Sequence, residues 1–153
     1  MKSQSSAARM TPADLNVQGW LNISDAARLS EIQLAQAVAN GLSIKSLGTM
    51  QKTFGKKFVV GKGALVSEST VSRRKHDAGT LDKDVSERLY GMARVLAALS
   101  KTYHGNTELI GRFLHTANPV LEGHIPYDLA RSSVAGADVV LRHIKRLDAG
   151  VAA

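Results

Sequence analysis

The sequence predicts an all-α protein, and three observations carry this prediction. The 153 residues include only three prolines, so long stretches are free to be helical. Apolar residues recur at steps of three and four positions, which is the spacing of one face of a helix. Ser, Asn, Asp or Gly stands at most of the expected helix ends. Apolar residues make up 44% of the chain, enough for the core of one domain or of two small modules.

The N-terminal elements are marked mainly by their caps. Residues 1–19 are polar and small at the start, and we expect them to form a disordered tail. Ser30 and Gln33 make a capping box for a helix that Gly41 ends. The side chains expected to face inward from it are Leu29, Ile32, Ala35 and Ala39. A further helical stretch begins at Ser43 and ends at Gly55.

The glycine-rich segment 55–63 superficially resembles a phosphate-binding loop, but its spacing does not fit one. Gly55 and Gly61 are one residue too far apart, and Gly63 stands where Ser or Thr would bind magnesium. Gly61 and Gly63 would also weaken a helix by roughly 1 kcal/mol each relative to Ala. The segment therefore predicts an interruption rather than a nucleotide site.

The strongest helix signal follows a turn at Gly79. Asp82 or Asp84 can cap this helix, and its apolar residues follow steps of four and three. They are Val85, Leu89, Met92, Leu96, Leu99 and Tyr103. We interpret this stripe as a core face, with the seam of a dimer as the alternative.

The C-terminal part predicts two more helices around an ordered loop. The first helix runs from Thr107 to about His115, and the loop 118–129 carries two prolines and a glycine that restrict its backbone. The last helix is expected from about Ser133 to Leu147. Its inward side chains are expected to be Val134, Ala137, Leu141 and Ile144.

Catalytic and metal-binding patterns are missing from the sequence. The histidines at 76, 104, 115, 124 and 143 show neither i,i+4 pairing nor local clustering, there is no Gly-x-Ser-x-Gly string, and there is no cysteine. We therefore expect no enzyme, no catalytic residue, no metal and no cofactor. The lack of cysteine, of a signal peptide and of an apolar run of membrane-spanning length favours a cytoplasmic protein with no membrane partner.

The charge distribution favours DNA as a partner. Residues 1–75 hold 11 Lys and Arg against 4 Asp and Glu, whereas residues 76–153 hold 9 of each. Within the basic half, Ser67 can cap a short helix with hydroxyls near its start and cations further along. A DNA recognition helix needs small polar groups for base edges and cations for phosphates. The predicted DNA-binding residues are Ser69, Thr70, Ser72, Arg73, Arg74 and Lys75. A solvated basic helix is the alternative interpretation.

Two stretches of the sequence resemble a known family of antitoxins. The segment from Gly41 through the Ser67–Arg74 stretch to Leu96 resembles the helix-turn-helix part of Xre/MbcA/ParS-type antitoxins. The string Asn-Pro-x-Leu-x-Gly-x-x-Pro-x-Asp-Leu at 118–129, with Gly136 and the final helix, resembles the toxin-binding domain of that family. The usual Trp-Leu before this string is Phe113-Leu114 here. The resemblance implies a helix-turn-helix DNA-binding domain at 20–105 and a toxin-binding domain at 106–153.

The resemblance also implies a function and partners. It implies an antitoxin that binds a RES-domain toxin, and this toxin is an enzyme that degrades NAD. The antitoxin is also implied to bind operator DNA as a homodimer and so to repress its own operon. The implied toxin-binding residues are Asn118, Pro119, Leu121, Arg142, Arg146 and Asp148. We expect Asp148 and the small residues after it to block the substrate site of the toxin, because a site that binds a pyrophosphate presents cations. The alternative function is a free-standing helix-turn-helix repressor without a toxin partner.

Overall fold

The computed structural model describes residues 16–76 and 79–152, and all named elements within them are helices. Only two isolated bridges, Ser43 to Thr80 and Val60 to Val66, have strand-like pairing there. The all-α prediction is confirmed. No helix in the described part is long and apolar enough to cross a membrane.

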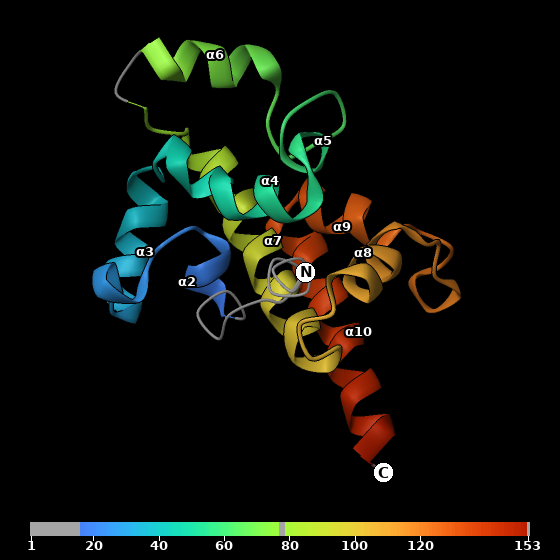
Figure 1. Ribbon diagram of the computed structural model, residues 1–153. Helices are drawn as coiled ribbons and strands as arrows, with labels where there is room; N and C mark the ends of the chain where they lie inside the picture. Colours follow the sequence, from blue (N-terminus) through green and yellow to red (C-terminus); the bar gives the residue numbers. More distant parts are fainter. Residues whose placement is uncertain (1–15, 77–78, 153) are drawn as a thin grey trace, which may run out of the picture.

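The elements follow one another with short connections (Figure 1). In the N-terminal half they are α2 (Val17–Trp20), η2 (Asp25–Ala27), α3 (Glu31–Asn40), η3 (Ile44–Leu47), α4 (Gly48–Phe54), α5 (Lys56–Val59) and α6 (Glu68–His76). They continue as α7 (Lys83–Thr102), α8 (Thr107–His115), η4 (Pro119–Leu121), α9 (Pro126–Ser132) and α10 (Val134–Ala152).

Helix α7 is the centre of the fold, as its heptad stripe predicts. In Figure 1 it runs through the middle, and α2 and α3 pack on it from the N-terminal half and α9 and α10 from the C-terminal half. Leu89, Met92, Leu96 and Leu99 are completely buried, and Val85 is 8% exposed. Because the stripe lies inside the core of its own chain, it is not available as a dimer seam.

Aromatic side chains join the N-terminal half directly to α9. Trp20 stacks on Phe54 with ring centroids 5.7 Å apart, Phe54 on Phe58 at 4.7 Å, and Phe58 lies 4.9 Å from Tyr127 of α9. The Tyr127 hydroxyl donates a hydrogen bond to the carbonyl of Phe58. Burial raises the pKa of Tyr127 to about 12, so this hydroxyl remains a donor at neutral pH. The helix just before the glycine turn is thus held directly on the C-terminal helices.

Several local boundaries differ from the expectations. Asn16 caps α2 by accepting a hydrogen bond from the Gly19 amide at 2.7 Å, so residues 16–19 begin a helix rather than end a tail. Trp20 anchors this helix by donating to Ser100 of α7 at 3.2 Å. The remainder of the expected tail lies outside the described residues.

The predicted inward face of α3 is wrong. The capping box of Ser30 and Gln33 forms as expected, but the helix buries Leu34 and Val38 against α7, while Ile32 is 72% exposed. Alanines lie on both faces of this helix, and the two larger side chains spaced by four positions decide which face packs.

The C-terminal helices also differ from the expectation. The loop after residue 118 contains a one-turn helix, η4, and the seven-residue helix α9, which begins at Pro126. In α10, Val134 is 39% exposed rather than inward, whereas Ala137 and Ile144 are buried as predicted. This helix continues past Leu147 to Ala152 because Ala and Val follow and Gly150 does not turn the chain.

Candidate functional site

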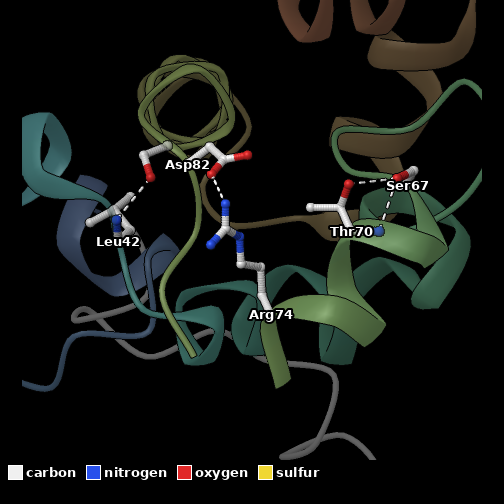
Figure 2. A network of polar contacts seen from close by, with 6 residues as sticks. Leu42, Ser67, Thr70, Arg74 and Asp82 are labelled. Atoms are coloured by element: carbon white, nitrogen blue, oxygen red, sulfur yellow. Dashed lines mark hydrogen bonds and ion pairs between the residues drawn. The ribbon is translucent and has the colours of Figure 1, made fainter. Parts of the chain in front are cut away.

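Helix α6 is the most exposed α-helix of the basic half. It lies at one end of the molecule in Figure 1, and none of its residues is buried. The predicted cap is confirmed: the Ser67 hydroxyl accepts a hydrogen bond from the Thr70 amide at 3.1 Å and donates to the Thr70 hydroxyl at 2.8 Å (Figure 2). The start of α6 is therefore fixed by the sequence immediately before it.

The six predicted DNA-binding residues all lie on α6, but they do not share one environment. Ser69, Ser72, Arg73 and Lys75 are exposed, whereas Thr70 is half-buried. Arg74 is not directed outward as expected: its guanidinium makes an ion pair with Asp82 at the start of α7 (Figure 2). The arginine thus braces α6 against the central helix instead of presenting a cation to a partner.

More lysines surround α6 than the sequence reasoning considered. Lys52, Lys56, Lys57 and Lys62 are exposed on α4, α5 and the turn that follows. A groove of about 330 Å³ separates α6 from α4 and α5, and both Lys56 and Lys75 line it. Lys56 comes to lie beside α6 only through the fold, so the sequence alone does not predict its position next to Lys75.

The glycines of this segment lie in a turn and not in a helix. Gly61 has φ of 139° and Gly63 of 78°, values that side-chain-bearing residues rarely adopt. Helix α5 accordingly stops at Val59 after a single turn. The helix before α6 is therefore much shorter than the resemblance to a helix-turn-helix implies.

Asn118 organises the loop before α9. Its side-chain oxygen accepts a hydrogen bond from the Val120 amide at 2.9 Å, and its carbonyl accepts one from the Gly123 amide at 2.9 Å. Leu121 is 5% exposed and packs into the core, whereas Val120 is 64% exposed. Leu121, one of the predicted toxin-binding residues, thus anchors the loop from inside the core, whereas Val120, which the prediction did not include, is the exposed side chain.

A groove of about 320 Å³ lies between α8 and this loop. Asn118 and Pro119 line it, as do Tyr103, Leu109, Arg112 and Phe113. The sequence string at 118–129 predicts Asn118 and Pro119 as site residues, whereas the side chains of α8 come to lie beside them only through the fold. The groove offers an apolar floor beside one arginine.

His143 of α10 contacts both Asn118 of the loop and Phe113 of α8. It is 4% exposed, stacks on Phe113 with centroids 6.0 Å apart, and its Nε2 lies 3.1 Å from the Asn118 amide nitrogen. Since the Asn118 oxygen already caps Val120, the amide nitrogen is the donor and Nε2 of a neutral imidazole accepts. Burial lowers the pKa of His143, and the charge of Arg146 lowers it further.

We expect the protein to lose stability in mild acid because of His143. The folded chain binds a proton at His143 less readily than the unfolded chain, so the stabilisation is complete above the ordinary pKa of 6.5 and decreases as the pH falls below it. Urea unfolding at pH 7 and pH 5 should show the decrease. His143→Gln can still accept from Asn118 and does not titrate, so its pH dependence should be smaller. Equal pH dependence in both proteins would contradict the assignment.

The C-terminal part of α10 projects beyond the other helices in Figure 1. Arg142, Lys145, Arg146 and Asp148 are all exposed on it, as predicted. Asp148 accepts a hydrogen bond from the Thr102 hydroxyl at 2.9 Å, which ties it to the end of α7. Residues 149–152, the small residues expected to block the substrate site together with Asp148, continue the helix.

Residues 98–150 match the family model of the antitoxin Xre/MbcA/ParS C-terminal toxin-binding domain. The match covers roughly a third of the chain, from the end of α7 through most of α10. Neither the curated proteins nor the solved structures gave a match to the chain. The family match supports an antitoxin role in a toxin–antitoxin system, with a toxin as partner and without catalysis by this domain.

Proposed function

We propose that the chain is the antitoxin of a RES-domain toxin that degrades NAD, and that it inhibits this toxin by covering its active site. The observation that carries the proposal is the family match over 98–150, which coincides with the exposed groove beside Asn118 and the projecting end of α10. In the cytoplasm such an antitoxin would act on the toxin made from the same operon.

The toxin-facing surface has the composition of a protein interface. The groove between α8 and the loop is lined by aromatic and aliphatic side chains and by Arg112, and Val120, which follows the lining residue Pro119 in the chain, is exposed. Arg146 and Asp148 are exposed on the adjoining helix α10, whereas Arg142 lines a separate groove with Arg94 and Asp138. Aromatic residues and arginines are the side chains most often found at the energetic centre of protein interfaces.

Co-expression with a RES-type neighbour tests the inhibitory role. We expect one complex in size exclusion and loss of NAD consumption by the toxin. Separate elution with unaltered NAD consumption would contradict the antitoxin proposal and leave the free-standing repressor as the explanation for the DNA-binding surface.

We further propose that α6 binds operator DNA and that the protein represses its own operon. The support is a capped, exposed helix that carries hydroxyls and the exposed cations Arg73 and Lys75 and belongs to the basic half of the chain. Operator sites are commonly two-fold symmetric, so we retain a homodimer in the proposal. Its interface lies elsewhere than the buried stripe of α7.

Single alanine variants of α6 should separate phosphate contacts from base contacts. Arg73→Ala and Lys75→Ala should each weaken binding to all duplexes and lower the slope of log affinity against log salt by about one unit. Ser69→Ala, Thr70→Ala or Ser72→Ala should instead alter sequence preference. Lys101→Ala, an exposed lysine at the far end of α7, is the control. Unchanged slopes for both cationic variants would refute the placement of α6 on DNA.

A further inference from the structure

The end of the molecule around α6 carries a strong positive charge. Between Gly48 and His76 the sequence has seven lysines and arginines and a single acidic residue, Glu68. Arg74 is engaged with Asp82, but the other cations are exposed. Only two of these exposed cations, Arg73 and Lys75, belong to α6 itself. The remaining ones therefore need a separate explanation.

Lys62 stands at the tip of a tight and well-anchored loop, residues 59–66. The Val66 amide donates to the Val59 carbonyl and the Gly61 amide to the Val66 carbonyl, both at 2.9 Å. The aliphatic side chains on both sides of the tip, Val59, Val60, Leu65 and Val66, are all buried. Lys62 is thus an exposed lysine on a backbone that is already ordered, which reduces the entropy lost when it binds a partner.

The glycines on either side of Lys62 leave the tip open. A Cβ atom added to Gly61 or Gly63 would meet no atom within 4 Å. Among the described residues, no hydrogen bond is made by the main-chain N–H of Lys62 or of Gly63. The backbone at the tip can therefore approach an anion closely, and both N–H groups and the Lys62 ammonium can donate hydrogen bonds to it.

The loop is held at the starting end of α6. Val66 directly precedes Ser67, the cap of α6, and the groove shared by Lys56 and Lys75 places α5 beside the same helix. Figure 1 shows the loop and α5 next to the end where α6 begins. The first residues of a recognition helix are those that reach base edges, and the phosphates of the DNA backbone flank that point of entry.

We propose that the loop 59–66 and helix α5 form a second contact to DNA, in which Lys62 and Lys57 bind backbone phosphates beside the groove that α6 enters. This inference rests on the proposed binding of DNA by α6. It assigns a role to the glycines that interrupt the helix before α6. They shorten that helix to one turn and put a phosphate-binding tip in its place.

The test is a salt titration of Lys62→Ala, Lys57→Ala and the double variant. Each single variant should lower the salt slope by about 0.9, so the weakening relative to wild type should shrink about 3.5-fold between 50 and 200 mM salt. The double variant should lose about twice that slope. Two duplexes of equal length, the promoter region and an unrelated sequence, should be affected equally. Lys101→Ala is the matched control, and circular dichroism checks that each variant is folded.

The results distinguish this inference from the assignment of α6. If Arg73→Ala lowers the slope while Lys57→Ala and Lys62→Ala do not, the second contact is refuted and the placement of α6 stands. If the lysine variants lower the slope and Arg73→Ala and Lys75→Ala do not, α6 is placed wrongly and the loop remains a phosphate contact. If the wild-type protein binds neither duplex, both proposals are overturned.

Discussion

Replacing Gly136 by alanine should destabilise the protein by about 3 kcal/mol, near the upper end of the usual cost of overpacking. A Cβ atom at this position would lie 2.0 Å from the Leu129 carbonyl oxygen and 2.9 Å from its carbon. Both are backbone atoms of α9, so no side chain can swing away to make room. Helices α9 and α10 would have to separate, although their contact is one of the most extensive in the fold.

Gly111→Ala is the matched control for this substitution. Gly111 lies inside α8, and an added Cβ there would meet nothing within 4 Å. Alanine should therefore stabilise α8 by up to about 1 kcal/mol, the difference in helix propensity. Urea unfolding of both variants measures the contrast. A Gly136→Ala protein with the midpoint of wild type would mean that α9 and α10 do not meet closely at this residue. Because α10 carries part of the proposed toxin surface, Gly136→Ala should also weaken toxin binding.

Local signals in the sequence predict the helix ends and the central helix. The capping box at Ser30 and Gln33, the stops at Gly41 and Gly55 and the cap at Ser67 depend on residues within a few positions of each other. The stripe of α7 is long and built of large side chains, so its buried face is unambiguous. These features follow from hydrogen bonding and periodicity alone.

The structure differs from the prediction at helices whose sequence pattern is weak or whose packing depends on distant residues. The face of α3 is ambiguous in the sequence because alanines lie on both faces of the helix, and only packing on α7 selects Leu34 and Val38. Helix α9 is short and begins at a proline, a pattern that is also typical of an ordered loop. Length and side-chain size thus limit what periodicity can decide.

The candidate sites also combine residues that are close in sequence with residues that only folding brings together. The hydroxyls and cations of α6 are adjacent in sequence, so the sequence brings them together as a candidate site. The partner of Arg74 is eight positions away on another helix, and His143 lies 25 positions from Asn118. The lysines of α5 and of the loop 59–66 become part of the candidate DNA-binding surface only when these segments fold beside α6. Contacts between separate elements are therefore what the sequence does not predict.

The projecting end of α10 should be needed for inhibition of the toxin. Asp148 is exposed on that end and is oriented by Thr102, so its carboxylate has a defined position on a rigid helix. An enzyme that binds NAD must present cations or other donors to the pyrophosphate, and an acidic side chain can occupy the same place. We therefore propose Asp148, on the projecting end of α10, as the charged group that enters the substrate site.

Truncation after Leu147 and the substitution Asp148→Lys should both release the toxin. Removing or reversing a charge that is paired and buried in a complex costs about 2–5 kcal/mol, which is roughly a 30- to 5,000-fold increase in Kd. Titration of NAD consumption with each variant measures this loss, and circular dichroism verifies that α10 is retained. Asp25→Lys makes the same charge change on an exposed residue of the N-terminal half and should inhibit like wild type. If the truncated and Asp148→Lys proteins both still inhibit at an equimolar ratio, Asp148 does not enter the substrate site. Inhibition must then come from coverage by the groove between α8 and the loop at Asn118.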